Sequence, residues 1–191
     1  MKIDKGEAGY LRQKRKHIAT ITFLQFMITL GLFVFGVLKE GLTLNLFTII
    51  SAVVALPTLY SLTKLIRIYP YQSINEAREI EIAGKTDSLT VLFDLVIKCD
   101  RKYVPIRSVV ISDNIVCGYT NDRFVKTDPT AAYIKGILEE NGIEKVTVRI
   151  LHDYVSFLSR AEGMQNIANI QGNFRQDKIE KIADLLKERS L

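Results

Sequence analysis

Two long runs of uncharged and mostly apolar residues occupy the first third of the chain. Residues 18–38 form 21 positions without a charge, and residues 41–63 form 23 more, separated only by Lys39 and Glu40. A helix needs about 20 apolar residues, each rising ~1.5 Å, to cross a hydrocarbon layer ~30 Å thick. Both runs are long enough, so the pattern predicts a transmembrane helical hairpin over residues 18–66.

Two other interpretations of these runs fit the pattern less well. A cleaved signal peptide has an apolar core of only ~7–15 residues and then a small-residue cleavage site, whereas here a second apolar run follows. A buried hairpin in a soluble protein needs other apolar elements around it, and the rest of the chain offers few. The polar residues inside the runs are uncharged, which is typical of helix–helix contacts and disfavours an ion or proton pathway.

After the apolar runs the pattern changes to short elements. Ser73 to Glu76 reads as a capping box that starts a helix, and Gly84 is its natural end. Runs rich in β-branched residues follow at 89–99, 104–112 and 115–120, and Asp113-Asn114 between the last two is a tight-turn signal. We interpret the three runs as strands, although the length of the first is also compatible with a helix.

The last third of the chain predicts a helix, a strand and two more helices. The first helix starts at Asp128-Pro129 and ends at Asn141-Gly142, and alternating apolar residues then predict a strand over 144–151. Asp153 caps the next helix, and residues 174–191 form the last. The expected fold is therefore a transmembrane hairpin plus a cytoplasmic α+β domain of order α-β-β-β-α-β-α-α. Its segments are a basic cytoplasmic tail (1–17), the hairpin (18–66), a linker helix (67–87) and the α+β domain (88–191).

Charge is concentrated beside the apolar runs. Six basic and two acidic side chains precede residue 18, whereas residues 64–191 carry 19 basic and 18 acidic ones. Lys and Arg next to a span mark its cytoplasmic side and are attracted to anionic lipids; here these orienting residues are Arg12, Lys14, Arg15, Lys16, Lys64 and Arg67. We therefore expect a multi-pass protein of a plasma (inner) membrane with both termini cytoplasmic. The near-neutral domain gives no indication of nucleic-acid binding.

Cys117 is the candidate nucleophile of the chain. With His152 as base and Asp153 or Asp113 to orient it, it would form a thiolate–imidazole pair, but a free cysteine in a strand is commonly a small core residue. Two cysteines and two histidines without C-x-x-C or H-x3-H spacing predict no zinc site. In a reducing compartment we expect no disulfide, and without a glycine-rich phosphate loop we expect no cofactor.

The predicted order of strands resembles that of restriction-endonuclease-like nucleases. The metal site of that family needs a Pro-Asp followed by an (Asp/Glu)-x-Lys on the adjacent strand. Here Ile106 follows Pro105, and the strand around Cys117 has no acid-x-Lys. The resemblance therefore implies at most a degenerate nuclease-like protein.

Several segments together resemble a set of small uncharacterised bacterial two-span membrane proteins. They are the opening MKIDKGEAGYLRQKRK, the exit IYPYQSI, and the later VCGYTND, AAYIKGILEENG, VTVRI and FLSRAEGM. Some of these proteins carry the label O-linked N-acetylglucosamine transferase-like, so the resemblance implies a bacterial membrane protein and, as one alternative, a glycosyltransferase-like activity. It identifies no catalytic motif, and the chain has no D-x-D pair for a sugar nucleotide.

We therefore expect a membrane-anchored cytoplasmic interaction or scaffold domain, with the lipid bilayer and another protein as partners. A membrane-tethered enzyme using Cys117 and His152 is the alternative. The sequence leaves the pathway and the oligomeric state open. The candidate partner-binding residues are Tyr119, Asn121, Asp122 and Arg123, at and after the exposed end of the strand that contains Cys117, and Arg160 and Glu162 in a later turn.

Overall fold

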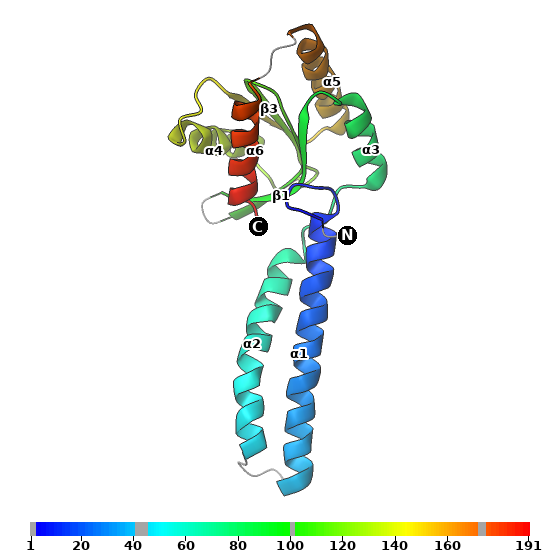
Figure 1. Cartoon of the computed structure of the whole chain (residues 1–191), viewed down its shortest axis with the longest axis vertical. Helices are drawn as coiled ribbons and strands as arrows, with labels where there is room; N and C mark the ends of the chain where they lie inside the picture. Colours follow the sequence, from blue (N-terminus) through cyan, green and yellow to red (C-terminus); the bar gives the residue numbers. More distant parts are fainter. Residues whose placement is uncertain (1–2, 41–45, 100–101, 172–174) are drawn as a thin grey trace. The chain divides into compact units, whose positions relative to one another are not determined.

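The computed structural model describes residues 3–40, 46–99, 102–171 and 175–191. The chain divides into two compact units: Leu11–Gln72 form one, and Met1–Tyr10 together with Ser73–Leu191 form the other. The elements follow the predicted order, a helical hairpin and then α-β-β-β-α-β-α-α (Figure 1). The boundary at residue 17 differs, because the first helix begins at Tyr10 and the preceding residues belong to the α+β unit.

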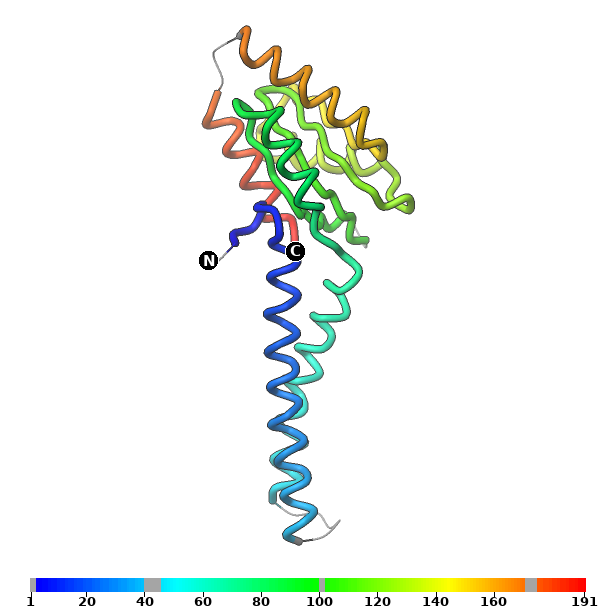
Figure 2. Tube along the Cα trace, turned by 90° about the vertical axis from the view of Figure 1, so that its right-hand side faces the viewer, coloured from blue at the N-terminus to red at the C-terminus, as the bar shows by residue number. Residues whose placement is uncertain are grey.

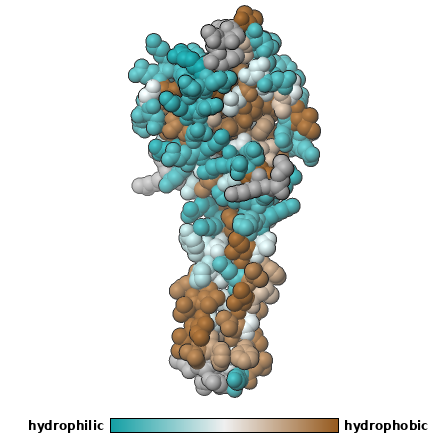
Figure 3. Space-filling model, in the orientation of Figure 1, coloured by the Kyte–Doolittle hydropathy of each residue, from teal (hydrophilic) through white to brown (hydrophobic). Residues whose placement is uncertain are grey.

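The first unit is a hairpin of two long helices, α1 (Tyr10–Glu40) and α2 (Leu46–Ile68). Both are long and apolar enough to cross a membrane, and only 11% of the most apolar stretch of each is buried. Figure 3 shows apolar side chains over the visible face of this unit and a mainly hydrophilic visible face on the α+β unit. The start of the second predicted run, residues 41–45, lies outside the described residues.

The two helices meet along a seam that contains most of the polar residues of the hairpin. Thr22, Ser51 and Thr58 are buried, while large apolar side chains such as Phe23 and Leu24 point outward. The hydroxyls of Thr22 and Thr58 donate to carbonyls one turn earlier, at 2.8 and 3.2 Å. Across the seam the hydroxyl oxygens of Thr29 and Thr58 lie 3.4 Å apart. The buried hydroxyls thus bond mainly within their own helices, and Thr29 and Thr58 provide a contact between the two helices.

The second unit is built on one mixed sheet of four strands in the order β1-β2-β3-β4. They are β1 (Thr90–Cys99), β2 (Lys102–Ile111), β3 (Ile115–Tyr119) and β4 (Thr147–Leu151). The first three pair antiparallel, and β4 lies parallel to β3. A parallel neighbour needs a crossover, and α4 (Thr127–Glu140) supplies it.

Helices cover both faces of this sheet (Figure 1 and Figure 2). One face packs against α4 and α6 (Gln176–Arg189) through a core that includes Leu95, Ile106, Leu138 and Ile182. The other packs against α3 (Glu76–Lys85) and α5 (Tyr154–Gln171), with Phe93, Val110, Cys117, Phe157 and Met164 in its core. The sequence predicts a linker helix over residues 67–87. The part of it that forms α3 packs against the sheet and is a layer of the domain.

Several helix boundaries differ from the predictions: α3 continues past Gly84 to Lys85, α6 begins two residues later than expected, and the starts of α3 and α4 also differ. Helix α3 is capped by Asn75, whose side chain accepts from the Ala77 N–H, and not by Ser73. Helix α4 begins at Thr127, one residue before the predicted cap, because Thr130 donates both its N–H and its hydroxyl to the Lys126 carbonyl. Its predicted end at Asn141-Gly142 is confirmed, with Gly142 at a φ of 76°.

A local irregularity interrupts the pairing of β1 with β2. Asp94 has a φ of 55°, and Leu92 before it and Leu95 after it both face the α4–α6 core. Side chains three residues apart in a regular strand point to opposite faces, so the alternation shifts between Leu92 and Leu95. The same shift occurs in β2, where Ile106 and Val109 both face the α4–α6 core. The alternation of side chains therefore moves by one residue at the level of Asp94 and Arg107, in both strands at once and without a change of register.

Candidate functional site

The structure places Cys117 in the hydrophobic core of the domain. It is the third residue of β3 and is fully buried against the α3–α5 layer. Burial raises the pKa of the Cys117 thiol to about 11, although the charges of Arg160 and Arg149 act in the opposite direction. A thiol with such a pKa stays protonated near neutral pH, whereas a nucleophilic cysteine works as the thiolate.

The two proposed partners of Cys117 have structural contacts of their own. The Nε2 atom of His152 lies 2.9 Å from the Val125 carbonyl oxygen. Asp153 accepts from the N–H and hydroxyl of Ser156 at 2.8 and 2.6 Å, as the predicted cap of α5. These hydrogen bonds lower the pKa of Asp153. Within the part of the chain that the structure describes, no hydrogen bond joins Cys117, His152 and Asp153, and no cluster of His, Cys, Asp and Glu could hold a metal ion.

Tyr119, expected at an exposed strand end, is 3% exposed and belongs to the core. Its hydroxyl accepts from Arg78 Nη1 at 2.8 Å, and the Arg78 guanidinium lies 4.5 Å from the centre of the Tyr154 ring. Tyr154 in turn donates to Glu81 at 2.7 Å; burial and this bond raise the pKa of Tyr154. The cluster fastens α3 to the sheet and to α5.

The Arg160 and Glu162 candidates lie on α5. Glu162 forms an ion pair of 2.5 Å with Lys85 of α3. Arg160 is half-buried, and its Nε atom has no hydrogen-bond partner among the described residues. Glu162 thus has a role in joining two helices of the domain.

Asn121, Asp122 and Arg123 lie in the loop that joins β3 to α4, which is ordered by its own side chains. The Asn121 Oδ1 accepts from Arg107 Nε at 2.8 Å, and Asp122 Oδ1 accepts from the Phe124 N–H at 3.0 Å. The Asp122 carbonyl also accepts from the Val125 N–H at 3.1 Å. Arg123 is exposed.

Phe124 is the residue of this loop that the sequence reasoning missed. It is 95% exposed, although its neighbour Val125 is buried in the α4–α6 core. Because Val125 must point inward and Asp122 fixes the backbone, the Phe124 side chain is held outward. An isolated aromatic residue between charged residues, as in the NDRFVK stretch, is the signal that could have indicated it.

Phe124 forms one wall of a groove of about 450 Å³ between the start of β2 and the start of α4. We call this surface the aromatic groove; its main lining residues are Lys102, Tyr103, Phe124, Lys126, Pro129 and Tyr133. Three aromatic rings and a proline provide an apolar surface, and Lys102 and Lys126 outweigh the one lining carboxylate, that of Asp122, so the lining has a net positive charge. The arrangement is suited to holding an apolar side chain beside an acidic group.

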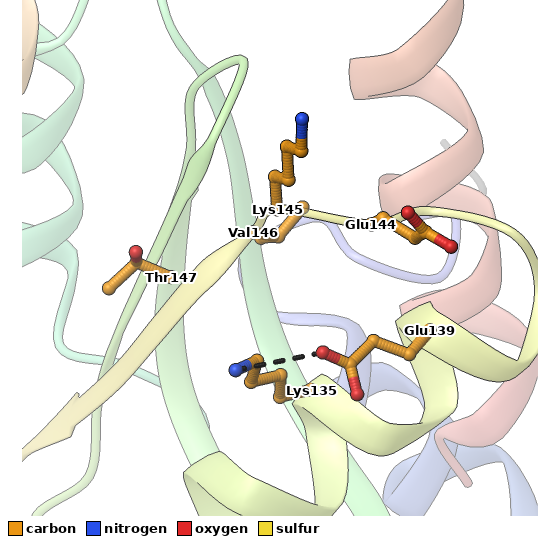
Figure 4. Close-up of a pocket in the computed structure, with 6 residues that line it drawn as sticks. All are labelled: Lys135, Glu139, Glu144, Lys145, Val146 and Thr147. Carbon is orange, nitrogen blue, oxygen red and sulfur yellow. Dashed lines mark ion pairs between the residues drawn. The ribbon is translucent and has the colours of Figure 1, made fainter.

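A second hollow, of about 590 Å³, lies between α4 and the start of β4. Figure 4 shows Lys135 and Glu139 paired with each other along α4, while Lys145 and Thr147 point away from them. The ion pair is 3.6 Å long and joins exposed side chains of one helix, so its charges are directed at each other rather than at a shared ligand. The aromatic groove is therefore the better candidate site.

Comparisons with protein-family models, with curated proteins and with solved structures find no match to this chain.

Proposed function

We propose that this protein is a membrane-anchored interaction protein. Its hairpin crosses the inner membrane of a bacterium, both chain ends and the α+β domain lie in the cytoplasm, and the domain binds another protein through the aromatic groove.

The distribution of side chains on the hairpin supports membrane insertion. Many of its exposed positions are large and apolar, among them Phe23, Phe26, Ile28 and Leu56, while the hydroxyl residues Thr22, Ser51 and Thr58 are buried. A continuous apolar surface of this kind is unfavourable in water and is what a bilayer requires. The hydroxyls of Thr22, Ser51 and Thr58 each donate to a carbonyl of their own helix, so these hydroxyls have acceptors although they are buried between the helices.

The proposed orientation rests on cations and aromatic rings at one end of the hairpin. Lys64 Nζ lies 4.2 Å from the centre of the Tyr60 ring, and the Arg15 guanidinium lies 5.8 Å from that of Tyr69. Arg15 Nη1 also donates to the Tyr69 carbonyl at 3.4 Å. Tyrosines and basic residues gather at the cytoplasmic interface of membrane proteins, which supports a cytoplasmic position for this end.

The observation that carries the binding function is the outward Phe124. A solvent-exposed phenylalanine loses the free energy that its burial would provide, roughly 1.5–3 kcal/mol. Here the loop is held in that conformation by Asp122 and by the burial of Val125. Aromatic residues in a pocket are the usual anchors of protein interfaces, and the groove beside Phe124 offers such a pocket.

Site-specific photo-crosslinking tests this proposal. A photoreactive phenylalanine analogue at position 124, in cells that express the full chain, should give a discrete higher-mass adduct with a second protein. The matched control is the same analogue at Ile170, which is 85% exposed but distant from the groove along the chain, and it should give none. Equal crosslinking at both positions, or none at position 124, would remove the basis for a binding role of the groove.

A further inference from the structure

We propose that the two ends of the hairpin control the aromatic groove through Asp94 of β1 and Arg107 of β2. This inference rests on the proposed function, because it concerns regulation of the groove. Its test reads the groove loop in the absence of a partner, so that the two proposals can fail separately.

Asp94 holds both ends of the hairpin. Its carboxylate is 1% exposed; one oxygen, Oδ2, accepts from the Gly9 N–H at 2.9 Å, and the other, Oδ1, accepts from the Ile74 N–H at 2.8 Å. Gly9 directly precedes α1, and Ile74 lies six residues after the last residue of α2. One buried carboxylate therefore fixes the chain just before it enters the hairpin and just after it leaves.

The segment before Gly9 is fixed to the same strand. The Phe93 N–H donates to the Gly6 carbonyl at 2.7 Å, and the ammonium group of Lys5 donates to the carbonyl of Ser190. Gly6 and Gly9 have φ angles of 95° and 83°, a region that favours glycine. These two glycines let the chain follow the edge of β1 before α1 begins.

Arg107 lies opposite Asp94 in the sheet, between the pairs Phe93↔Ser108 and Leu95↔Ile106. Burial lowers the pKa of Arg107, and the negative charge of Asp94 acts against that shift. Arg107 Nε donates to Asn121, but its Nη1 atom is buried without a hydrogen-bond partner among the described residues. Arg107 thus has its Nε donor committed to the groove loop, while the two N–H groups of its buried Nη1 are uncommitted.

From Asn121 the contacts continue directly into the groove. The next residue, Asp122, accepts from the N–H groups of Phe124 and Val125. Its own N–H donates to the Thr120 hydroxyl at 3.3 Å, which donates to the Pro105 carbonyl of β2. The loop that presents Phe124 is therefore positioned from the part of β2 that contains Arg107.

These contacts define two arrangements. In the clasped one, Asp94 binds both hairpin ends and Arg107 binds Asn121. If a hairpin end moves away, Asp94 is left as a buried carboxylate with an unsatisfied oxygen, which is costly. The Arg107 guanidinium, with its uncommitted Nη1, then turns toward Asp94 and releases Asn121, so that the groove loop loosens. Because such coupling is reciprocal, a partner in the groove also favours the clasped arrangement.

Hydrogen exchange in the full-length protein in lipid nanodiscs tests this coupling. Ile74→Pro removes the N–H that Asp94 accepts, whereas Ile74→Ala, the matched control, loses side-chain packing but keeps the N–H. Losing one hydrogen bond to a charged group should speed local opening about tenfold. We expect that increase at the amides of Phe124 and Val125 in Ile74→Pro, and not in Ile74→Ala.

The Asp94→Asn background provides the decisive comparison. Asparagine tolerates the positive φ at this position but has no charge to attract Arg107, so Ile74→Pro should no longer affect Phe124 and Val125. The proposal is wrong if Ile74→Pro changes exchange only near residue 74, if Ile74→Ala acts equally, or if the effect of Ile74→Pro persists in the Asp94→Asn background.

A second variant serves if Ile74→Pro does not fold. Gly9→Ala strains a position with a φ of 83°, and Gly84→Ala in α3, where no atom lies within 4 Å of the added carbon, is its control. The same pattern of exchange is expected: faster exchange at Phe124 and Val125 for the first variant only. A change confined to the segment around Gly9 would overturn the proposal.

Discussion

The two units of this protein use apolar residues in opposite ways. In the α+β domain, Phe157 and Ile182 are fully buried, and most charged side chains, Asp94 excepted, are at least partly exposed. In the hairpin, Phe23 and Leu24 are 64% and 61% exposed and Thr58 is buried. Each pattern is favourable in only one solvent. The comparison supports the proposal that one stretch of the chain lies in water and the other in lipid.

The two units also satisfy their buried polar groups differently. In the hairpin, Thr22 and Thr58 bond to carbonyls four residues earlier in the same helix. In the domain, Asp94 and Thr120 bond to backbone groups far away in the sequence, at Gly9, Ile74 and Pro105. Polar burial in the hairpin is therefore local, whereas in the domain it determines which segments come together.

The largest contrast is expected from truncating a phenylalanine in each unit. Phe157→Ala removes a fully buried ring and should destabilise the domain by about 3–5 kcal/mol. Phe26→Ala, at a ring that is 51% exposed on the hairpin, should leave the unfolding of the domain unchanged. Urea denaturation followed by far-UV circular dichroism measures both; equal losses would contradict the division into two differently packed units.

A charge on the outer face of the hairpin should have the next largest effect. Ile28 is 50% exposed near the middle of the first apolar run. Ile28→Arg should oppose insertion by about 2.5–3.5 kcal/mol, and less of the protein should then cofractionate with membranes after carbonate extraction. Ile170→Arg, at an exposed isoleucine of the domain, should not change the membrane fraction.

Alkaline pH should weaken the domain through Cys117. Its pKa is raised from 9.0 to about 11 by burial, so the folded state favours the protonated thiol. This contribution is fully present below pH 9 and is lost as the pH rises from about 9 to about 11, because only the unfolded chain releases the proton there. Cys117→Ala should flatten the fall in unfolding free energy over this range; an unchanged pH profile would contradict the assigned burial.

The smallest effect is expected at the seam of the hairpin. Thr58→Val keeps the shape of the side chain but removes the hydroxyl that lies 3.4 Å from that of Thr29. Interhelical hydrogen bonds in membranes average about 0.6 kcal/mol, so the loss should be of that size. A double-mutant cycle with Thr29→Val, measured by unfolding in mixed micelles, should show that the two effects are not additive.

The hairpin and the strands could be predicted because their signals are local. The apolar runs and the β-branched stretches identify α1, α2 and the four strands without knowledge of tertiary contacts. The tertiary contacts of Asp94 could not be predicted in this way, since Gly9 lies 85 residues away. The segment before α1 was therefore interpreted as a basic tail, although it lies along β1.

Parts of the site were also beyond sequence reasoning. Tyr119 was expected at an exposed strand end, but β3 directs Ile115, Cys117 and Tyr119 to the same layer, and only the helices α3 and α5 above them determine that this layer is closed. Phe124 is exposed because its neighbour Val125 is needed in the opposite core. Both outcomes depend on packing across the sheet.

The central claim, that the hairpin crosses a membrane and leaves the domain on the cytoplasmic side, is tested most directly by cysteine accessibility. Lys39 lies at the C-terminal end of α1, close in sequence to the residues that join α1 to α2. Lys98 is an exposed residue of β1. In intact cells a membrane-impermeant maleimide should label Lys39→Cys, and it should label Lys98→Cys only after the cells are permeabilised. Labelling of Lys98→Cys in intact cells, or protection of Lys39→Cys until permeabilisation, would contradict the account.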